Sequence, residues 1–244
     1  MVRRPARKSA PKSTRAAVPA AARDAGQPAN DRDKIIAALL GLLGEKPIEQ
    51  IGFSEIAERA GVSLAQLRGE FGSTLAIVAA FLKDIDRAVL GADLSDMAEE
   101  PPRERLFDVL MRRLEALGTQ REAVRSLIRS ASRNPPLALA LNRFSVRSQQ
   151  WMLTAAGIKA SGPRGMLRAQ GLALMFSSVL RTWVRDDDPG LARTMAALDR
   201  ALARGQRFAG LLDDLFAVPS RICRLRGRGR RRWRSEDSED SAIA

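Results

Sequence analysis

The sequence has no histidine and no tyrosine among its 244 residues. Histidine is the commonest general base and the commonest metal ligand, because its pKa lies near neutral pH. Its absence also excludes the Ser-His and Cys-His pairs that activate a nucleophile. We therefore expect a protein that is not an enzyme, with no catalytic residues, no metal site and no cofactor.

Cysteine is almost as scarce, since Cys223 is the only one in the sequence. A single cysteine excludes an internal disulfide and is consistent with a reducing compartment. The basic N-terminus is not followed by the apolar segment of a signal peptide. No run approaches the roughly 18 consecutive apolar residues of a transmembrane helix. These absences predict a cytoplasmic protein.

The positive charge is concentrated at the two ends of the chain. Of the net charge of +13, residues 1–30 carry +6 (seven Lys or Arg, one Asp) and residues 219–244 carry +4 (eight Arg, four acids). Such clusters are typical of contact with nucleic acid or an anionic membrane, or serve only to keep the chain soluble. We expect a disordered basic arm over 1–30 and a disordered tail, Arg-rich and then acidic, over 219–244. Candidates for phosphate or minor-groove contact in the arm are Arg3, Arg4, Arg7, Lys8, Lys12 and Arg15.

Between the two ends, apolar residues recur at helical spacing and no segment shows strand alternation. A first helix is expected over about residues 32–43 with Asp31 as its N-cap, and a second from Gly52, as N-cap, to Ala60. Together with a short helix after Ser63, the pattern predicts an all-α fold of about nine helices. The longer helices that follow are expected at 74–90, 103–117, 120–132, 137–157, 164–185 and 189–216.

The chain is expected to turn sharply after the second helix. Gly61 suits the left-handed conformation that ends a helix, and Ser63 with Gln66 forms a capping box that opens the next one. A helix, a glycine turn and a short helix with an exposed polar face make a helix-turn-helix. Its second helix enters the major groove of DNA, with its N-terminal residues at base edges. The expected DNA contacts are Ser63, Leu64, Ala65, Gln66, Arg68 and Thr74.

This stretch also resembles a known family. The sequence FSEIAERAGVSLAQLRGEFGSTLAIVAAFL is similar to the signature of TetR transcriptional regulators. Arg68 stands where that family usually has an aromatic residue, and Thr74 stands where it usually has a lysine. Both family positions commonly anchor phosphates. The matching positions are Ile56-Ala57, Ala60-Gly61-Val62-Ser63, Leu67 and Phe71.

The resemblance implies a TetR-like fold with two domains. A helix-turn-helix DNA-binding domain is expected over residues 31–83, and a helical ligand-binding and dimerisation domain over 84–218. It further implies a homodimer that binds double-stranded DNA and acts as a ligand-responsive repressor, with a small apolar molecule as its effector.

A second resemblance falls on the C-terminal half. The stretches RERLFDVLMRRLEALGTQREAVRSLIR and WVRDDDPGLARTMAALDRALARG are similar to ubiquinone-biosynthesis accessory proteins, which share the TetR fold and bind isoprenoid lipid. The alternative function implied is a non-enzymatic lipid-binding accessory protein with peripheral contact to a membrane or lipid. The match is carried by Trp183, Asp186, Thr194, Leu198 and Asp199.

Large apolar side chains in this half are candidates for an effector pocket, because ligand pockets are mostly hydrophobic. Ordinary core packing explains the same side chains equally well, and the flexibility of methionine slightly favours a pocket. The candidate pocket residues are Trp151, Met152, Met175, Phe176 and Trp183.

Three consecutive acids, Asp186 to Asp188, precede the last predicted helix. Such acids suit either a metal site or the positive end of a helix dipole. Since Asp188 is followed by Pro189, we expect Asp188 to be the N-cap and Pro189 to be the first helical residue.

Overall fold

The computed structural model describes residues 30–92, 97 and 99–206. Within these ranges the chain forms nine α-helices and no β-strand, which confirms the predicted all-α fold. The basic arm before Asn30 and the tail over 219–244 lie outside the described residues. None of the described helices combines the length and the apolar character needed to cross a bilayer.

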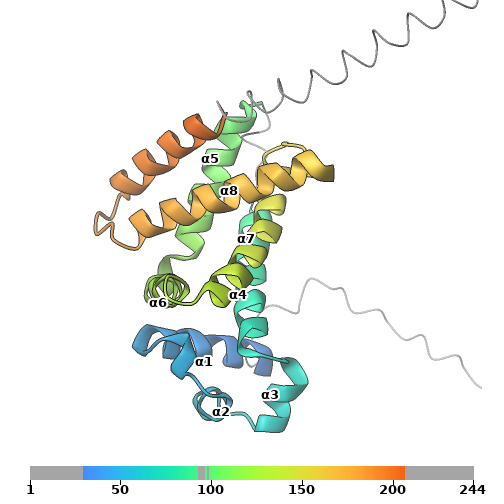
Figure 1. Cartoon of the computed structure of the whole chain (residues 1–244), viewed down its shortest axis with the longest axis vertical. Helices are drawn as coiled ribbons and strands as arrows, with labels where there is room; N and C mark the ends of the chain where they lie inside the picture. Colours follow the sequence, from blue (N-terminus) through green and yellow to red (C-terminus); the bar gives the residue numbers. More distant parts are fainter. Residues whose placement is uncertain (1–29, 93–96, 98, 207–244) are drawn as a thin grey trace, which may run out of the picture.

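The lower part of the molecule in Figure 1 is built by α1 (Asp31–Glu45), α2 (Phe53–Ala60), α3 (Leu64–Glu70) and the start of α4 (Thr74–Leu90). A 3-10 turn, Ile48–Gln50, links α1 to α2. α1 lies across α2 and α3, and its buried leucines and isoleucines form most of the shared core. The innermost side chains are Ile35, Leu39, Leu42, Leu43, Ile56, Leu67 and Ile77.

α1 begins one residue earlier than expected. Its N-cap is Asn30, not Asp31, because the Asn30 side chain accepts a hydrogen bond from the backbone N–H of Arg32 at 3.1 Å. Asp31 is instead the first helical residue, where a carboxylate is favoured by the helix dipole. This displacement leaves the Asp31 side chain available for contacts with other residues.

The upper part contains α5 (Pro102–Ala116), α6 (Arg121–Ala131), α7 (Pro135–Ala155), α8 (Gly162–Trp183) and a helix over residues 192–206 (Figure 1). A 3-10 turn, Gly118–Gln120, separates α5 from α6. α5, α7 and α8 begin slightly before the predicted positions, since each has a proline in its first turn, where a fixed φ suits the helix. α4 runs from the lower part into the upper part and packs against α5 and α7.

A buried polar cluster ties α4 to the upper helices. The Arg113 guanidinium on α5 forms an ion pair with Asp86 on α4, and the hydroxyl of Ser148 on α7 donates to the same carboxylate at 2.6 Å. Arg113 is only 3% exposed, and its guanidinium lies over the ring of Phe176 on α8, 5.8 Å from the centroid. One cation therefore connects four helices through a carboxylate, a hydroxyl and an aromatic face.

The last described helix begins later than predicted. It starts at residue 192 rather than at Pro189, after Leu191 with a positive φ of 52°, and its predicted end at 216 lies outside the described residues. The expected roles of Asp188 as N-cap and Pro189 as first helical residue are therefore wrong. The Asp188 carboxylate closes a turn with the N–H of Gly190 and also accepts from the N–H of Ala192, so the chain cannot become helical before the turn is complete.

Two of these acids, Asp186 and Asp188, nevertheless cap the last described helix. The buried Asp186 carboxylate accepts hydrogen bonds from the backbone N–H of Thr194 at 2.8 Å and from its hydroxyl at 2.6 Å. Across the described part of the chain, no group of three or more acids or cysteines is arranged to hold a metal ion. Asp186 and Asp188 together satisfy the first N–H groups of the 192–206 helix.

The Asp186 cap makes stability depend on pH. The hydrogen bond from the Thr194 hydroxyl lowers the pKa of Asp186 below its usual value of 3.8. Because the folded pKa is lower than the unfolded one, the cap stabilises the protein above the unfolded pKa, and this contribution is lost as the pH falls through the folded pKa. We expect Asp186→Ala to lower the melting temperature at pH 7, and the difference from wild type to shrink below about pH 4. Thermal unfolding of both proteins across that range tests this, and a difference independent of pH would contradict it.

Candidate nucleic-acid interface

The turn between α2 and α3 has the conformation that its glycine predicts. Gly61 adopts φ 65° and ψ 35°, which is a left-handed conformation. This conformation is unfavourable for a residue that has a Cβ atom and is readily adopted by glycine. Its N–H and that of Val62 donate to carbonyls of the last turn of α2, the latter to Ala57 at 3.0 Å. The carbonyls that end α2 are thus satisfied while the chain reverses toward α3.

The predicted capping box opens α3. The Ser63 hydroxyl accepts from the backbone N–H of Gln66 at 3.2 Å, and the Gln66 side-chain oxygen accepts from the N–H of Ser63 at 2.9 Å. The other end of the Gln66 amide donates to the Asp31 carboxylate on α1 at 2.9 Å. Gln66, expected from sequence as a base contact, therefore uses both ends of its amide to fix α3 in place.

The outward face of α3 carries most of the other predicted contacts. Leu67 is 3% exposed and packs inward, whereas Leu64 is 53% exposed. Ser63, Ala65 and Arg68 are also exposed, and Leu64 and Arg68 lie four residues apart on one face. Thr74 is half-buried and is the first residue of α4, separated from α3 by the turn at Gly72. The structure thus brings Leu64, Ala65 and Arg68 onto one solvent-facing surface.

That surface has the chemistry to read a base pair. An arginine can donate two hydrogen bonds to the O6 and N7 atoms of guanine, or hold a phosphate. The apolar side chains of Leu64 and Ala65 suit contact with a thymine methyl group. Arg68 has no ion-pair partner among the described residues.

Two ion pairs hold the C-terminal end of α1 against α2. The Arg59 guanidinium on α2 donates two hydrogen bonds to the Glu45 carboxylate on α1, both at 2.9 Å, and thereby lowers the pKa of Glu45. Lys46 pairs with Glu55 at 2.6 Å. Sequence reasoning missed these pairs and the Asp31–Gln66 bond, because their partners lie 9 to 35 residues apart and no local pattern links them.

The upper part contains an apolar cavity of about 810 Å³ between α5, α7, α8 and the 192–206 helix. Of the five predicted pocket residues, only Met175 lines it. Met152, Phe176 and Trp183 are buried in the core, and Trp151 is 56% exposed on α7, so the predicted pocket does not form as a unit. The physical reason is that periodicity marks an inward face but does not separate side chains that fill the core from those that border a void.

Arginines surround this cavity. Arg103, Arg164, Arg168 and Arg204 are among the lining residues, with Leu106, Leu153 and Leu172 as part of the apolar wall. Arg103 forms ion pairs with Glu104 at 2.6 Å and with Asp199, which raise the pKa of Arg103. The cavity therefore combines an apolar interior with cationic groups, an arrangement suited to an amphipathic anion.

The residues that carry the resemblance to lipid-binding accessory proteins have structural roles here. Trp183 and Leu198 are core residues, Asp186 and Thr194 form the cap, and Asp199 pairs with Arg103. None of these five lines the cavity. These five residues stabilise the junction between α8, the 192–206 helix and α5. They do not by themselves indicate a lipid ligand.

The site and the architecture define a helix-turn-helix protein with a second, all-helical part. No protein-family model and no curated protein matches the sequence. Among solved structures, a TetR transcriptional regulator from Nitrosomonas europaea ATCC 19718 is 23% identical, over 72% of this chain and 98% of that chain, with a TM-score of 0.58. A TetR transcriptional regulator from Rhodococcus sp. RHA1 is 24% identical, over 72% of this chain and 95% of that chain, with a TM-score of 0.51. The chain has the fold of TetR regulators.

Proposed function

We propose that the protein is a cytoplasmic, DNA-binding transcriptional regulator. The observation that carries this proposal is the Gly61 turn with the Ser63/Gln66 capping box, which presents Leu64, Ala65 and Arg68 on one exposed face. An α-helix held in this way fits the major groove of B-DNA. Residues 31–83 form the DNA-binding domain in this proposal, and residues 84–218 form the domain for dimerisation and ligand binding.

A homodimer would supply the two recognition helices that a palindromic operator requires. Support comes from α8, on which Leu167 and Leu174 lie two turns apart on one face, are both exposed in the single chain and also form part of the lining of the cavity. Packing of this face against the same face of a second copy would bury both leucines and give a two-fold interface of helices.

Ligand-responsive repression is supported by the cavity and by α4. A volume of about 810 Å³ falls within the ~300–1,000 Å³ typical of small-molecule sites. α4 belongs to the DNA-binding domain at its start and contributes Asp86 to the buried cluster near its end. An effector that displaces α5 or α8 would therefore act on α4 through Arg113, and so on the spacing of two recognition helices.

Arg68→Ala tests the recognition surface. Loss of a bidentate base contact costs about 1–3 kcal/mol, so we expect operator affinity about 5- to 150-fold weaker, with unchanged thermal stability. The assay is a gel shift on the promoter next to the protein's own gene, compared with random DNA at fixed salt. The matched control is Arg143→Ala, which removes a charge that is also exposed, from α7. No preference of the wild type for the promoter or for any genomic fragment would contradict the proposed function.

The apolar part of the cavity lining also favours a second candidate function, in which the protein is a non-enzymatic accessory that carries an isoprenoid lipid. Native mass spectrometry of the protein purified without detergent tests this alternative. Co-purified isoprenoid lipid together with absence of operator binding would support it. An empty protein that binds operator DNA would overturn it.

A further inference from the structure

We propose that the cleft between the C-terminal end of α1 and α6 binds a hydroxylated phosphate ester, such as a sugar phosphate. In this assignment Arg129 and Arg133 hold the phosphate, and Glu49 on the facing wall accepts hydrogen bonds from hydroxyl groups of the ligand. The cleft shares no lining residue with the apolar cavity of the upper part. The inference therefore concerns a second site and does not rest on the proposed function.

The cleft lies where the lower part of the molecule meets the upper part. Figure 1 shows α6 above the end of α1 that is farther from α3, and the two helices are in contact. The cleft has a volume of about 570 Å³, within the ~300–1,000 Å³ typical of small-molecule sites. A phosphate group alone fills only a fraction of that volume. The size of the cleft therefore suits a phosphate that is attached to a further organic part.

Two exposed arginines line one side of the cleft. Arg129 lies in the last turn of α6, and Arg133 lies in the turn that joins α6 to α7. Neither forms an ion pair with any residue in the described ranges 30–92, 97 and 99–206. A guanidinium group donates hydrogen bonds in a planar fork that matches the oxygens of a phosphate. Two such groups can balance the charge of about −1.5 to −2 that a phosphate ester carries at neutral pH.

Three further charged residues of the lining are already neutralised by ion pairs. They therefore contribute little to the charge that a ligand would meet. The charge that remains in the cleft is that of the two arginines and of Glu49. The existing pairs are Lys46–Glu55 at 2.6 Å, Glu45–Arg59 at 2.9 Å and Glu122–Arg125 at 2.9 Å.

Glu49 provides hydrogen-bond acceptors on the wall that faces the arginines. Its carboxylate accepts from the Ser130 hydroxyl at 2.9 Å and from the Asn134 amide at 3.5 Å. A carboxylate has about four lone-pair sites, so it can accept further hydrogen bonds from the hydroxyl groups of a ligand. A ligand that is only an anion would instead be repelled by this carboxylate. Glu49 therefore favours a ligand with hydroxyl groups in addition to the phosphate.

The ends of two helices give the cleft the same polarity. α1 ends at Glu45 on one side of the cleft, and the 21-residue α7 begins at Pro135 on the other side. The C-terminal end of a helix is partly negative, and the N-terminal end is partly positive. Acceptor groups thus lie on the α1 side and positive potential on the side of α6 and α7. A phosphate with hydroxyl groups at its other end matches this arrangement.

Isothermal titration calorimetry at fixed ionic strength tests the site. The probes are glucose 6-phosphate, ribose 5-phosphate and glycerol 3-phosphate, and they are compared with glucose and inorganic phosphate. Three full-length proteins are titrated: the wild type, the cleft variant Arg129→Gln/Arg133→Gln and the control variant Arg143→Gln/Arg147→Gln. The control removes two exposed arginines, also four residues apart, from a face of α7 that does not line the cleft.

We expect the wild type to bind at least one of the three esters more tightly than it binds inorganic phosphate or glucose. The cleft variant should bind that ester at least about tenfold more weakly, because charge-assisted hydrogen bonds from two guanidinium groups are lost. Without ligand, its melting temperature should equal that of the wild type, since both side chains are exposed. The control variant should bind the ester as the wild type does.

Glu49→Gln separates the two halves of the site. It should weaken binding of the ester by about 3- to 10-fold, through loss of hydroxyl contacts, without weakening the binding of inorganic phosphate. Failure of all three esters to bind, or equal weakening by the cleft and control variants, overturns the inference. Equal affinity of the wild type for inorganic phosphate and for the best ester assigns the cleft to a bare anion and also overturns it. None of these results bears on the proposed function, which the gel shift tests separately.

Discussion

Arg113→Ala is expected to destabilise the protein by about 3–5 kcal/mol, the usual cost of removing one partner from a buried ion pair. The guanidinium is 3% exposed, and its loss leaves the Asp86 carboxylate in the interior with the Ser148 hydroxyl as its remaining described partner. It also removes the cation from the face of the Phe176 ring. Urea denaturation followed by circular dichroism measures the change in the free energy of unfolding.

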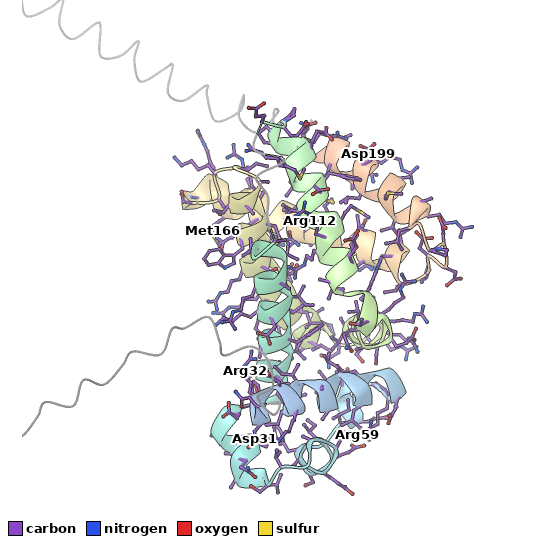
Figure 2. The ribbon with its side chains drawn as sticks, turned by 180° about the vertical axis from the view of Figure 1, so that it is seen from behind. Asp31, Arg32, Arg59, Arg112, Met166 and Asp199 are labelled. Carbon is purple, nitrogen blue, oxygen red and sulfur yellow. The ribbon has the colours of Figure 1, made fainter. Side chains whose placement is uncertain are left out.

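Two control variants separate loss of the ion pair from loss of side-chain volume. Arg112→Ala removes the neighbouring arginine, which is labelled in Figure 2 and pairs with Asp108 at 2.9 Å near the surface. We expect it to cost less than about 1 kcal/mol, as surface pairs do. The double variant Asp86→Leu/Arg113→Met replaces both charges with apolar groups and should lose less than Arg113→Ala alone. Equal losses for Arg112→Ala and Arg113→Ala would contradict the assignment of Arg113 as the central buried cation.

The helix-turn-helix was predictable because its signals are local. Gly61 sets a left-handed turn within its own residue, and Ser63 and Gln66 form their capping box across three positions. Such features require only short-range backbone geometry. The sequence alone therefore locates α2, α3 and α4 to within a residue or two.

The features that escaped prediction depend on tertiary contacts. Gln66 was expected at a base edge, but the Asp31 carboxylate, 35 residues earlier, engages its amide. The Asp86–Arg113 pair joins two helices 27 residues apart, and neither residue stands out in a helical pattern. Which polar side chains pair over long sequence distances depends on the angles and positions at which the helices cross. No short segment of the sequence specifies those crossings.

The five predicted pocket residues do not gather around one cavity, for a related reason. Trp151 and Trp183 are both large apolar side chains on predicted helices, yet the first is exposed on α7 and the second is fully buried beneath Arg121. Which side of a helix borders a void depends on gaps between neighbouring helices. The cavity instead collects residues such as Leu106 and Leu153, which the sequence marks only as ordinary inward positions.

Leu67→Ala is expected to cost about 2–5 kcal/mol and to abolish most operator binding. α3 has only seven residues, too few for an isolated helix to be stable in water, so it persists because it is docked. Leu67 is the one buried residue within α3, and the Gln66–Asp31 hydrogen bond and the buried Phe71 at its end add the remaining attachment. Without the Leu67 side chain, the recognition surface should open locally at a free energy below that of global unfolding.

Leu64→Ala is the matched control for Leu67, because it shortens a leucine three residues earlier on the same helix at a 53% exposed position. We expect it to change stability by less than about 0.5 kcal/mol, while altering affinity for operators that present a thymine methyl at the contact. Native-state hydrogen exchange distinguishes the two variants, since only Leu67→Ala should raise the exchange of the α3 amides. Equal protection of those amides in both variants, or full operator affinity of Leu67→Ala, would show that α3 is held in place by something other than Leu67.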